Sequence, residues 1–106
     1  MESQLLKMVL DKRSDYELIK QHIAVKNYSR EFGIVFGFIS DYYDRDSKVD
    51  YVELDTLKEL IRSSIQNEKH VERFHELLDE SAGLDVSGAN LKQVILQAKQ
   101  RELGNE

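Results

Sequence analysis

Residues 29–44 read SREFGIVFGFISDYYD, and this segment decides the fold. Its apolar side chains recur at intervals of three and four residues, which is the spacing of a helix face. They form two stripes: Phe32, Val35, Phe36, Ile39 and Tyr43 in the first, and Ile34, Phe38 and Tyr42 in the second. Because a helix that is apolar over most of its circumference is surrounded by other helices, we expect a buried central helix near residues 29–44.

Two glycines, Gly33 and Gly37, lie four residues apart on one side of this segment. Each glycine costs a helix up to about 1 kcal/mol relative to alanine, so its presence requires a compensation. We expect that compensation to be the close approach of another helix, at a place where a larger side chain would clash. The residues to which the sequence assigns a structural role in the central helix are Gly33, Gly37, Phe32, Phe36, Ile39 and Tyr43.

The rest of the chain has the same helical spacing and contains no proline, which would interrupt helix interiors. Further helices are expected over residues 2–12, from Ser14, after Asp50, from Asn67 and after Ser87. The expected helix caps are Ser14 with Glu17, Asp50 with Glu53, Asn67 alone, and Gly83 as a left-handed stop. The sequence thus predicts an all-α fold in which residues 1–106 form a small single-domain bundle of about six helices.

Length and composition limit the class of protein. The 106 residues are 41% hydrophobic and 33% charged, as expected for one soluble globular domain. The absence of cysteine excludes a disulfide scaffold, a thiolate zinc site and a cysteine nucleophile, and it favours a reducing, intracellular environment. No stretch approaches the roughly 18 apolar residues that span a membrane, and the N-terminus lacks the features of a signal peptide.

The formal net charge is −5, and most of the acidity lies in the middle of the chain. Residues 40–59 contain three basic and seven acidic residues, a net charge of −4. A net acidic domain without a cluster of lysine and arginine is poorly suited to hold a phosphate backbone, so we expect no direct binding of nucleic acid. An acidic segment instead suits solubility or a basic protein partner.

The loop over residues 44–50 resembles a calcium loop but lacks essential parts of one. Counted from Asp44, Lys48 stands where the fifth-position ligand belongs, and Val49 stands where glycine is required. The sequence also has no glycine-rich phosphate loop. We therefore expect no catalytic, cofactor-binding or metal-binding residues, and metal-dependent hydrolysis by the aspartates of this loop stays open as a residual alternative.

Two tyrosines near the same loop suggest a different role. Aromatic side chains dominate the binding energy of protein interfaces, and surrounding charge raises the rate of encounter. The candidate partner-binding residues are Tyr42, Asp44, Asp46, Asp50 and Tyr51. The alternative is that these groups only cap the two neighbouring helices and keep the loop soluble.

Several short segments, spread over nearly the whole chain, occur in the same order as in a known protein family. They are Glu2 to Leu10 with Ser14-Asp15, Tyr28 to Phe32, Ile39 with Tyr42-Tyr43, Val49-Asp50 with Leu54, Leu57 and Leu60, and Leu91 to Leu103. This order resembles the N-terminal domain of DnaB-type replicative DNA helicases, and it looks most like the phage versions. In that family a helical hairpin, a linker and an ATP-hydrolysing motor domain follow, and these 106 residues contain no motor motif.

The resemblance implies a non-catalytic protein-interaction and assembly domain. In the full-length protein, an ATP-dependent DNA helicase of the primosome, such a domain contributes to the hexamer collar, self-associates and contacts primase or a helicase loader. For this chain it implies no enzymatic activity, no cofactor and no membrane contact, and a location in the cytoplasm of a bacterial host cell. Two alternatives stay open: the helicase-binding C-terminal domain of a primase, which has a related fold, and a small phage regulatory adaptor protein.

Overall fold

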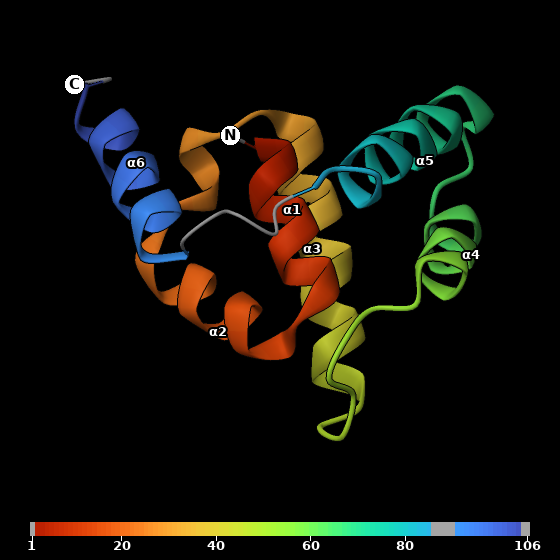
Figure 1. Cartoon of the computed structure of the whole chain (residues 1–106). Helices are drawn as coiled ribbons and strands as arrows, with labels where there is room; N and C mark the ends of the chain where they lie inside the picture. Colours follow the sequence, from red (N-terminus) through yellow and green to blue (C-terminus); the bar gives the residue numbers. More distant parts are fainter. Residues whose placement is uncertain (1, 86–90, 105–106) are drawn as a thin grey trace.

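The computed structural model describes residues 2–85 and 91–104, which are helical apart from short connections. The elements in chain order are α1 (Glu2–Asp11), α2 (Arg13–His22), the 3₁₀ helix η1 (Val25–Asn27), α3 (Arg30–Arg45), α4 (Leu54–Ser64), α5 (Glu68–Ala82) and α6 (Leu91–Gly104). Within this part of the chain there are six α-helices and no strand, which confirms the predicted all-α bundle. Figure 1 shows α1 in the middle, α3 behind it, α6 on one side and the α4–α5 pair on the other.

The core is centred on α1 and α3. Helix α1 packs against α2, α3 and α5. Half of its ten residues are buried: Leu5, Leu6, Met8, Val9 and Leu10. Helix α3 buries the whole of its first stripe: Phe32, Val35, Phe36, Ile39 and Tyr43. Because each Å² of apolar surface removed from water contributes roughly 25 cal/mol, these two helices supply much of the favourable term in folding.

The glycines of α3 do not have the predicted role. A Cβ atom added to Gly37 would have no heavy atom from outside its own turn of helix within 4 Å among the described residues, and the residue is exposed. At Gly33 such an atom lies 3.5 Å from Val25 Cγ1, which is an ordinary van der Waals distance. The expectation of a helix in close approach at Gly33 and Gly37 is wrong, because Gly37 lies on the solvent side of α3 and Gly33 meets only a side chain of η1.

The second stripe of α3 is only half-buried. Ile34, Phe38 and Tyr42 pack against the edge of the core and keep part of their surface in solvent. Ile34 and Phe38 line an open groove, together with Ile65 and Phe74 from the α4–α5 side. Helix α3 is therefore buried along its first stripe and leaves an apolar groove along its second.

Two helix starts are capped by side chains in the usual way. At the start of α3, the Ser29 hydroxyl accepts a hydrogen bond from the Phe32 amide at 3.2 Å. The carboxylate of Glu2 in α1 accepts from the Ser29 amide at 2.7 Å and from the Ser29 hydroxyl at 2.9 Å. Asn67 caps α5 as predicted, because its side chain accepts from two amides of the first turn.

The capping box predicted at Ser14 is absent. Ser14 lies inside α2, and the N-cap is Lys12, which makes no side-chain cap hydrogen bond. The amide of Arg13 instead donates to the carbonyl of Asp50 at 2.7 Å. A distant segment thus satisfies one of the amides that a helix start leaves without an internal partner.

The capping box predicted for Asp50 and Glu53 is also absent. The N-cap of α4 is Glu53, which makes no side-chain cap hydrogen bond, and its amide donates to the Tyr42 hydroxyl at 3.2 Å. Gly83 ends α5 in a right-handed conformation with φ of −81° rather than in the predicted left-handed one. The reason is that its amide continues the helical pattern by donating to the Asp79 carbonyl at 3.1 Å.

Two outer parts complete the bundle (Figure 1). Helix α6 packs against α2 and buries Val94, Ile95 and Ala98. The predicted start of this helix at Ser87 lies outside the described residues. On the other side, α4 and α5 pack together, and Lys58 Nζ lies 2.6 Å from Asp79 Oδ1. None of the described helices has the length and apolar character needed to cross a membrane.

Candidate partner-binding surface

The five residues predicted to bind a partner lie at the end of α3 and in the loop that leads to α4, at one end of the bundle (Figure 1). Tyr42 is half-buried, and the other four are exposed: Asp44, Asp46, Asp50 and Tyr51. Tyr51 is 58% exposed, the largest value among the large hydrophobic side chains that the structure describes. This region therefore presents an aromatic ring and three carboxylates to solvent.

A shallow cavity of about 280 Å³ brings three of these candidates together. Its lining residues are Tyr42, Lys48, Val49, Asp50, Tyr51 and Glu53. Asp44 and Asp46 lie outside the lining, so the cavity unites both tyrosines with one of the three aspartates. Lys48, to which the sequence analysis assigns no role in binding, offsets part of the negative charge.

Arg13 holds the loop in place from the start of α2. Its Nη1 atom donates hydrogen bonds to the carbonyl oxygens of Asp46 at 2.9 Å and Val49 at 3.0 Å. Its backbone amide donates to the Asp50 carbonyl at 2.7 Å. One residue thus satisfies three loop carbonyls, two of them through charge-assisted hydrogen bonds, which are roughly twice as strong as neutral ones. We call residues 46–51 the clamped loop.

Two further hydrogen bonds fix the clamped loop. The amide of Val52, which is buried, donates to the Leu10 carbonyl at 2.9 Å. The Asp46 carboxylate accepts from the Lys48 amide at 2.9 Å and closes a tight turn of the kind that aspartate favours. Asp46 therefore has a local structural role, and Tyr51 projects from between two neighbours whose backbone is anchored.

A buried tyrosine pair supports Arg13 from the core side. Tyr43 is fully buried, its ring stacks on Tyr16 with centroids 4.7 Å apart, and its hydroxyl donates to the Val9 carbonyl. The guanidinium carbon of Arg13 lies 5.4 Å from the Tyr43 ring centroid, within range of a cation–π contact. Burial raises the pKa of the Tyr43 phenol above its usual value. Tyr43 is thus part of the core, as the sequence predicts.

The carboxylates of Asp44 and Asp50, at and beside the clamped loop, are exposed. Four ion pairs of the described residues involve other carboxylates: Lys7 with Asp11, Arg13 with Glu17, Lys58 with Asp79, and Arg73 with Glu31. Asp44 and Asp50 form no ion pair within the described part of the chain, so nothing there neutralises them directly.

The backbone carbonyl that a calcium loop would offer to an ion is at its seventh position, which is Asp50 when counted from Asp44. Here that carbonyl accepts a hydrogen bond from the Arg13 amide at 2.7 Å. Among the side chains that the structure describes, in residues 2–85 and 91–100, no group of three or more histidines or carboxylates is placed to hold a metal ion. The clamped loop thus presents an exposed ring, that of Tyr51, on a backbone fixed by hydrogen bonds.

Arg13 is the residue that sequence reasoning missed. It lies 33 and 36 positions before the residues whose carbonyls its side chain binds. Every residue type carries a backbone carbonyl, so this contact leaves no pattern in the sequence. The basic pair Lys12-Arg13, which directly precedes a predicted helix, is the only local signal that could have drawn attention to it.

Neither protein-family models nor curated proteins nor solved structures give a match to this chain. The resemblance to helicase N-terminal domains therefore stays a hypothesis that rests on the sequence pattern. The position of the candidate partner-binding surface is inferred from the geometry of the clamped loop.

Proposed function

We propose that the chain is a non-catalytic protein-interaction domain, and that its contact surface is the clamped loop with Tyr42 and Asp44 beside it. The observation that carries the proposal is the 58% exposure of Tyr51 on a loop that Arg13 holds. A ring on a mobile loop loses conformational entropy when a partner binds, whereas a ring on a fixed loop avoids much of that cost. Tyrosine is also among the residues that dominate interface energies.

The charge around Tyr51 indicates the chemistry of the partner. Residues 40–59 carry a net charge of −4, and the carboxylates of Asp44 and Asp50 are exposed. Opposite charge on a partner raises the association rate, and salt screens the effect. The proposed partner surface is thus a pocket for an aromatic ring, surrounded by lysine or arginine.

The assembly that we propose is a phage-type replicative helicase of the DnaB kind. Its support is the resemblance in the order of sequence segments, and an all-α bundle is compatible with it. In this proposal the chain is the collar domain and self-associates within the hexamer of the full-length protein. It meets primase or a helicase loader through the clamped loop, in the cytoplasm of a bacterial host cell.

Two variants that remove equally exposed hydrophobic side chains test the contact. Tyr51→Ala removes the ring, and Leu96→Ala on α6, where the side chain is 56% exposed, is the control. Biolayer interferometry measures binding of each chain to the primase, the helicase motor region and the loader from the same source. We expect Tyr51→Ala to weaken binding at least about tenfold and Leu96→Ala to bind like the wild type.

The two parts of the proposal fail in different ways. Equal binding by Tyr51→Ala and the wild type would remove the clamped loop from the interface. Absence of binding between the wild-type chain and each of these three proteins would contradict the replicative role.

A further inference from the structure

A groove between α3 and α5 forms a second exposed apolar surface. Its floor is made by Ile34 and Phe38 of α3, Ile65 at the end of α4, and Phe74 of α5. Phe74 is buried and the other three are half-buried, so apolar surface stays open to solvent. The cavity has a volume of about 520 Å³, which is large enough to accept side chains of a partner.

The rim of this groove is basic in a chain whose net charge is −5. Arg30 at the start of α3 and His70 and Arg73 on α5 line it, together with one acidic residue, Glu31. Glu31 is paired with Arg73, with Oε1 at 3.1 Å from Nε. Arg30 is left to meet an acidic group of a partner, and the His70 side chain can hydrogen-bond beside it, so the groove favours the opposite charge from the clamped loop.

The ion pair between Glu31 and Arg73 also separates the groove from an acidic cavity. That neighbouring cavity shares these two residues and is lined further on by Glu2, Glu76 and Glu80. Its carboxylates repel an acidic partner. Charge therefore confines such a partner to the groove and away from the surface next to it.

The spacing of the groove-lining side chains along α3 suits a bound helix. Arg30, Ile34 and Phe38 follow one another at four-residue intervals on one face of the helix, over a length of about 12 Å. This is roughly two turns, the length over which a bound helix presents anchors at i, i+4 and i+7. We propose that the groove docks an acidic amphipathic helix of a partner protein, with its apolar side against Ile34 and Phe38 and its carboxylates toward Arg30 and His70.

A second copy of this chain fits the groove less well. A two-fold contact of groove with groove would place the same residues opposite each other. It would bring two basic rims together, and like charges across an interface are unfavourable. The proposal does not depend on the clamped loop, since a different set of residues and the opposite charge carry it.

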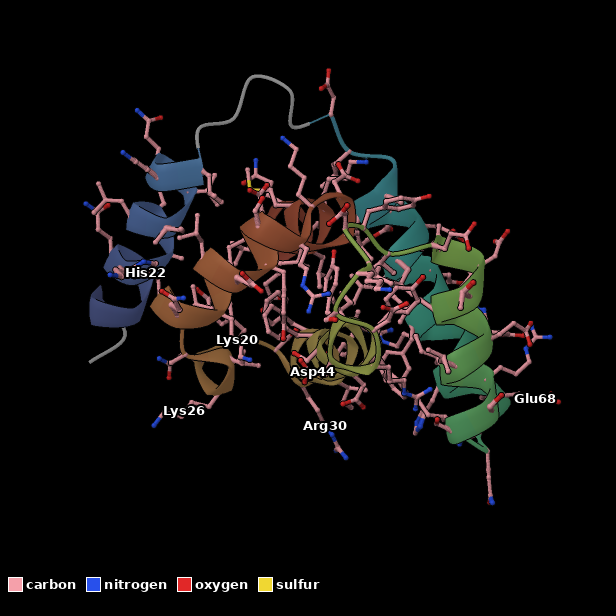
Figure 2. The ribbon with its side chains drawn as sticks, turned by 90° about the horizontal axis from the view of Figure 1, so that it is seen from below. Lys20, His22, Lys26, Arg30, Asp44 and Glu68 are labelled. Carbon is pink, nitrogen blue, oxygen red and sulfur yellow. The ribbon has the colours of Figure 1, made fainter. Side chains whose placement is uncertain are left out.

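A displayed library of peptides of about 15 residues, roughly four helical turns, is the probe. The library is selected against the full chain, and the affinity of the best synthetic peptide is measured by fluorescence anisotropy. Arg30→Glu is the main variant, because a glutamate is favoured in the first turn of a helix and the fold is kept. Lys26→Glu is its control, because the change of charge is the same. Lys26 lies in η1, on the same side of the molecule as Arg30 (Figure 2), and does not line the groove.

The selected peptides should carry apolar residues at i, i+4 and i+7 and a net negative charge. We expect Arg30→Glu to weaken the best peptide about three- to tenfold, Ile34→Glu to abolish its binding, and Lys26→Glu to leave it unchanged. The proposal is overturned if no peptide is enriched, if enriched peptides are basic, or if Arg30→Glu and Lys26→Glu act alike. A concentration-dependent dimer that Arg30→Glu disrupts would assign the groove to a second copy and also overturn it.

Discussion

The Arg13 guanidinium and the Val49 carbonyl lie 3.0 Å apart, although 36 positions separate these two residues in the chain. The contact joins the start of α2 to the connection between α3 and α4, two segments that the Arg13 amide and the Asp50 carbonyl also join at 2.7 Å. It makes the clamped loop part of the packed structure. A loop of this kind can display Tyr51 in one orientation.

Arg13→Lys should loosen the clamped loop, although the positive charge at position 13 is kept. Both carbonyl contacts are made by Arg13 Nη1, whose N–H directions are fixed by the planar guanidinium. A lysine ammonium does not share that geometry, so we expect it to lose one of the two contacts. The free energy of unfolding, from urea denaturation, should fall by about 1 kcal/mol. Amide hydrogen exchange at Val49 and Val52 should become faster.

The control for this change is Arg62→Lys on α4, an exposed arginine that does not contact the clamped loop. It should alter neither the unfolding free energy nor the exchange of those amides. Unchanged exchange in Arg13→Lys would mean that the loop is held by its other hydrogen bonds.

Gly37→Ala should stabilise the domain. The added Cβ atom has no neighbour within 4 Å, so the gain in helix propensity of up to about 1 kcal/mol is not opposed by a clash. For a domain of this size, 1 kcal/mol raises the Tm by roughly 4–8 °C. A lower Tm in a thermal melt followed by circular dichroism would show that another element covers this face of α3.

Tyr43→Phe should change how stability depends on alkaline pH. Burial raises the pKa of the folded Tyr43 phenol, so only the unfolded chain ionises this group above about pH 10. In the wild type its contribution to stability is complete below that pH and is lost as the pH rises further. Urea denaturation of Tyr43→Phe should show a shallower loss above pH 10.

At neutral pH the same variant should be about 1 kcal/mol less stable, because the Val9 carbonyl loses its hydrogen bond. Tyr51→Phe, at an exposed tyrosine, is the control for removal of a phenol. Identical alkaline slopes in Tyr43→Phe and the wild type would contradict the burial of the hydroxyl.

Asp44→Asn should slow association with the proposed partner at low salt. The variant removes one exposed negative charge near Tyr51, and the difference from the wild type should shrink as salt screens the field. Glu68→Gln is the matched control, because it makes the same change of charge at the start of α5, away from Asp44 (Figure 2). Equal association rates for the two variants at low salt would argue against steering by this surface.

The sequence predicts the fold well where a local period decides the structure. The first stripe of α3, including Phe32, Phe36 and Ile39, is buried because a repeat of three and four places these side chains on one face. Asn67 caps α5 through amides two and three residues away. Local spacing is enough for both features.

Features that depend on distant contacts could not be predicted. The starts of α2 and α4 use the Asp50 carbonyl and the Tyr42 hydroxyl in place of the predicted capping boxes. Gly37 is exposed because none of the described elements crosses that face of α3. Of the five candidate residues named from the sequence, Tyr42, Asp50 and Tyr51 line one cavity, whereas the clamp by Arg13 depends on tertiary packing.

The central claim is that Tyr51, on the clamped loop, touches a protein partner. Replacement of Tyr51 by the photoreactive residue p-benzoylphenylalanine, with the same replacement at Leu96 as control, tests it most directly. After irradiation of each chain with the primase, helicase motor region and loader of its source, position 51 should give a specific crosslink and position 96 should give none. A crosslink from position 96 alone, or from neither position, would contradict the account.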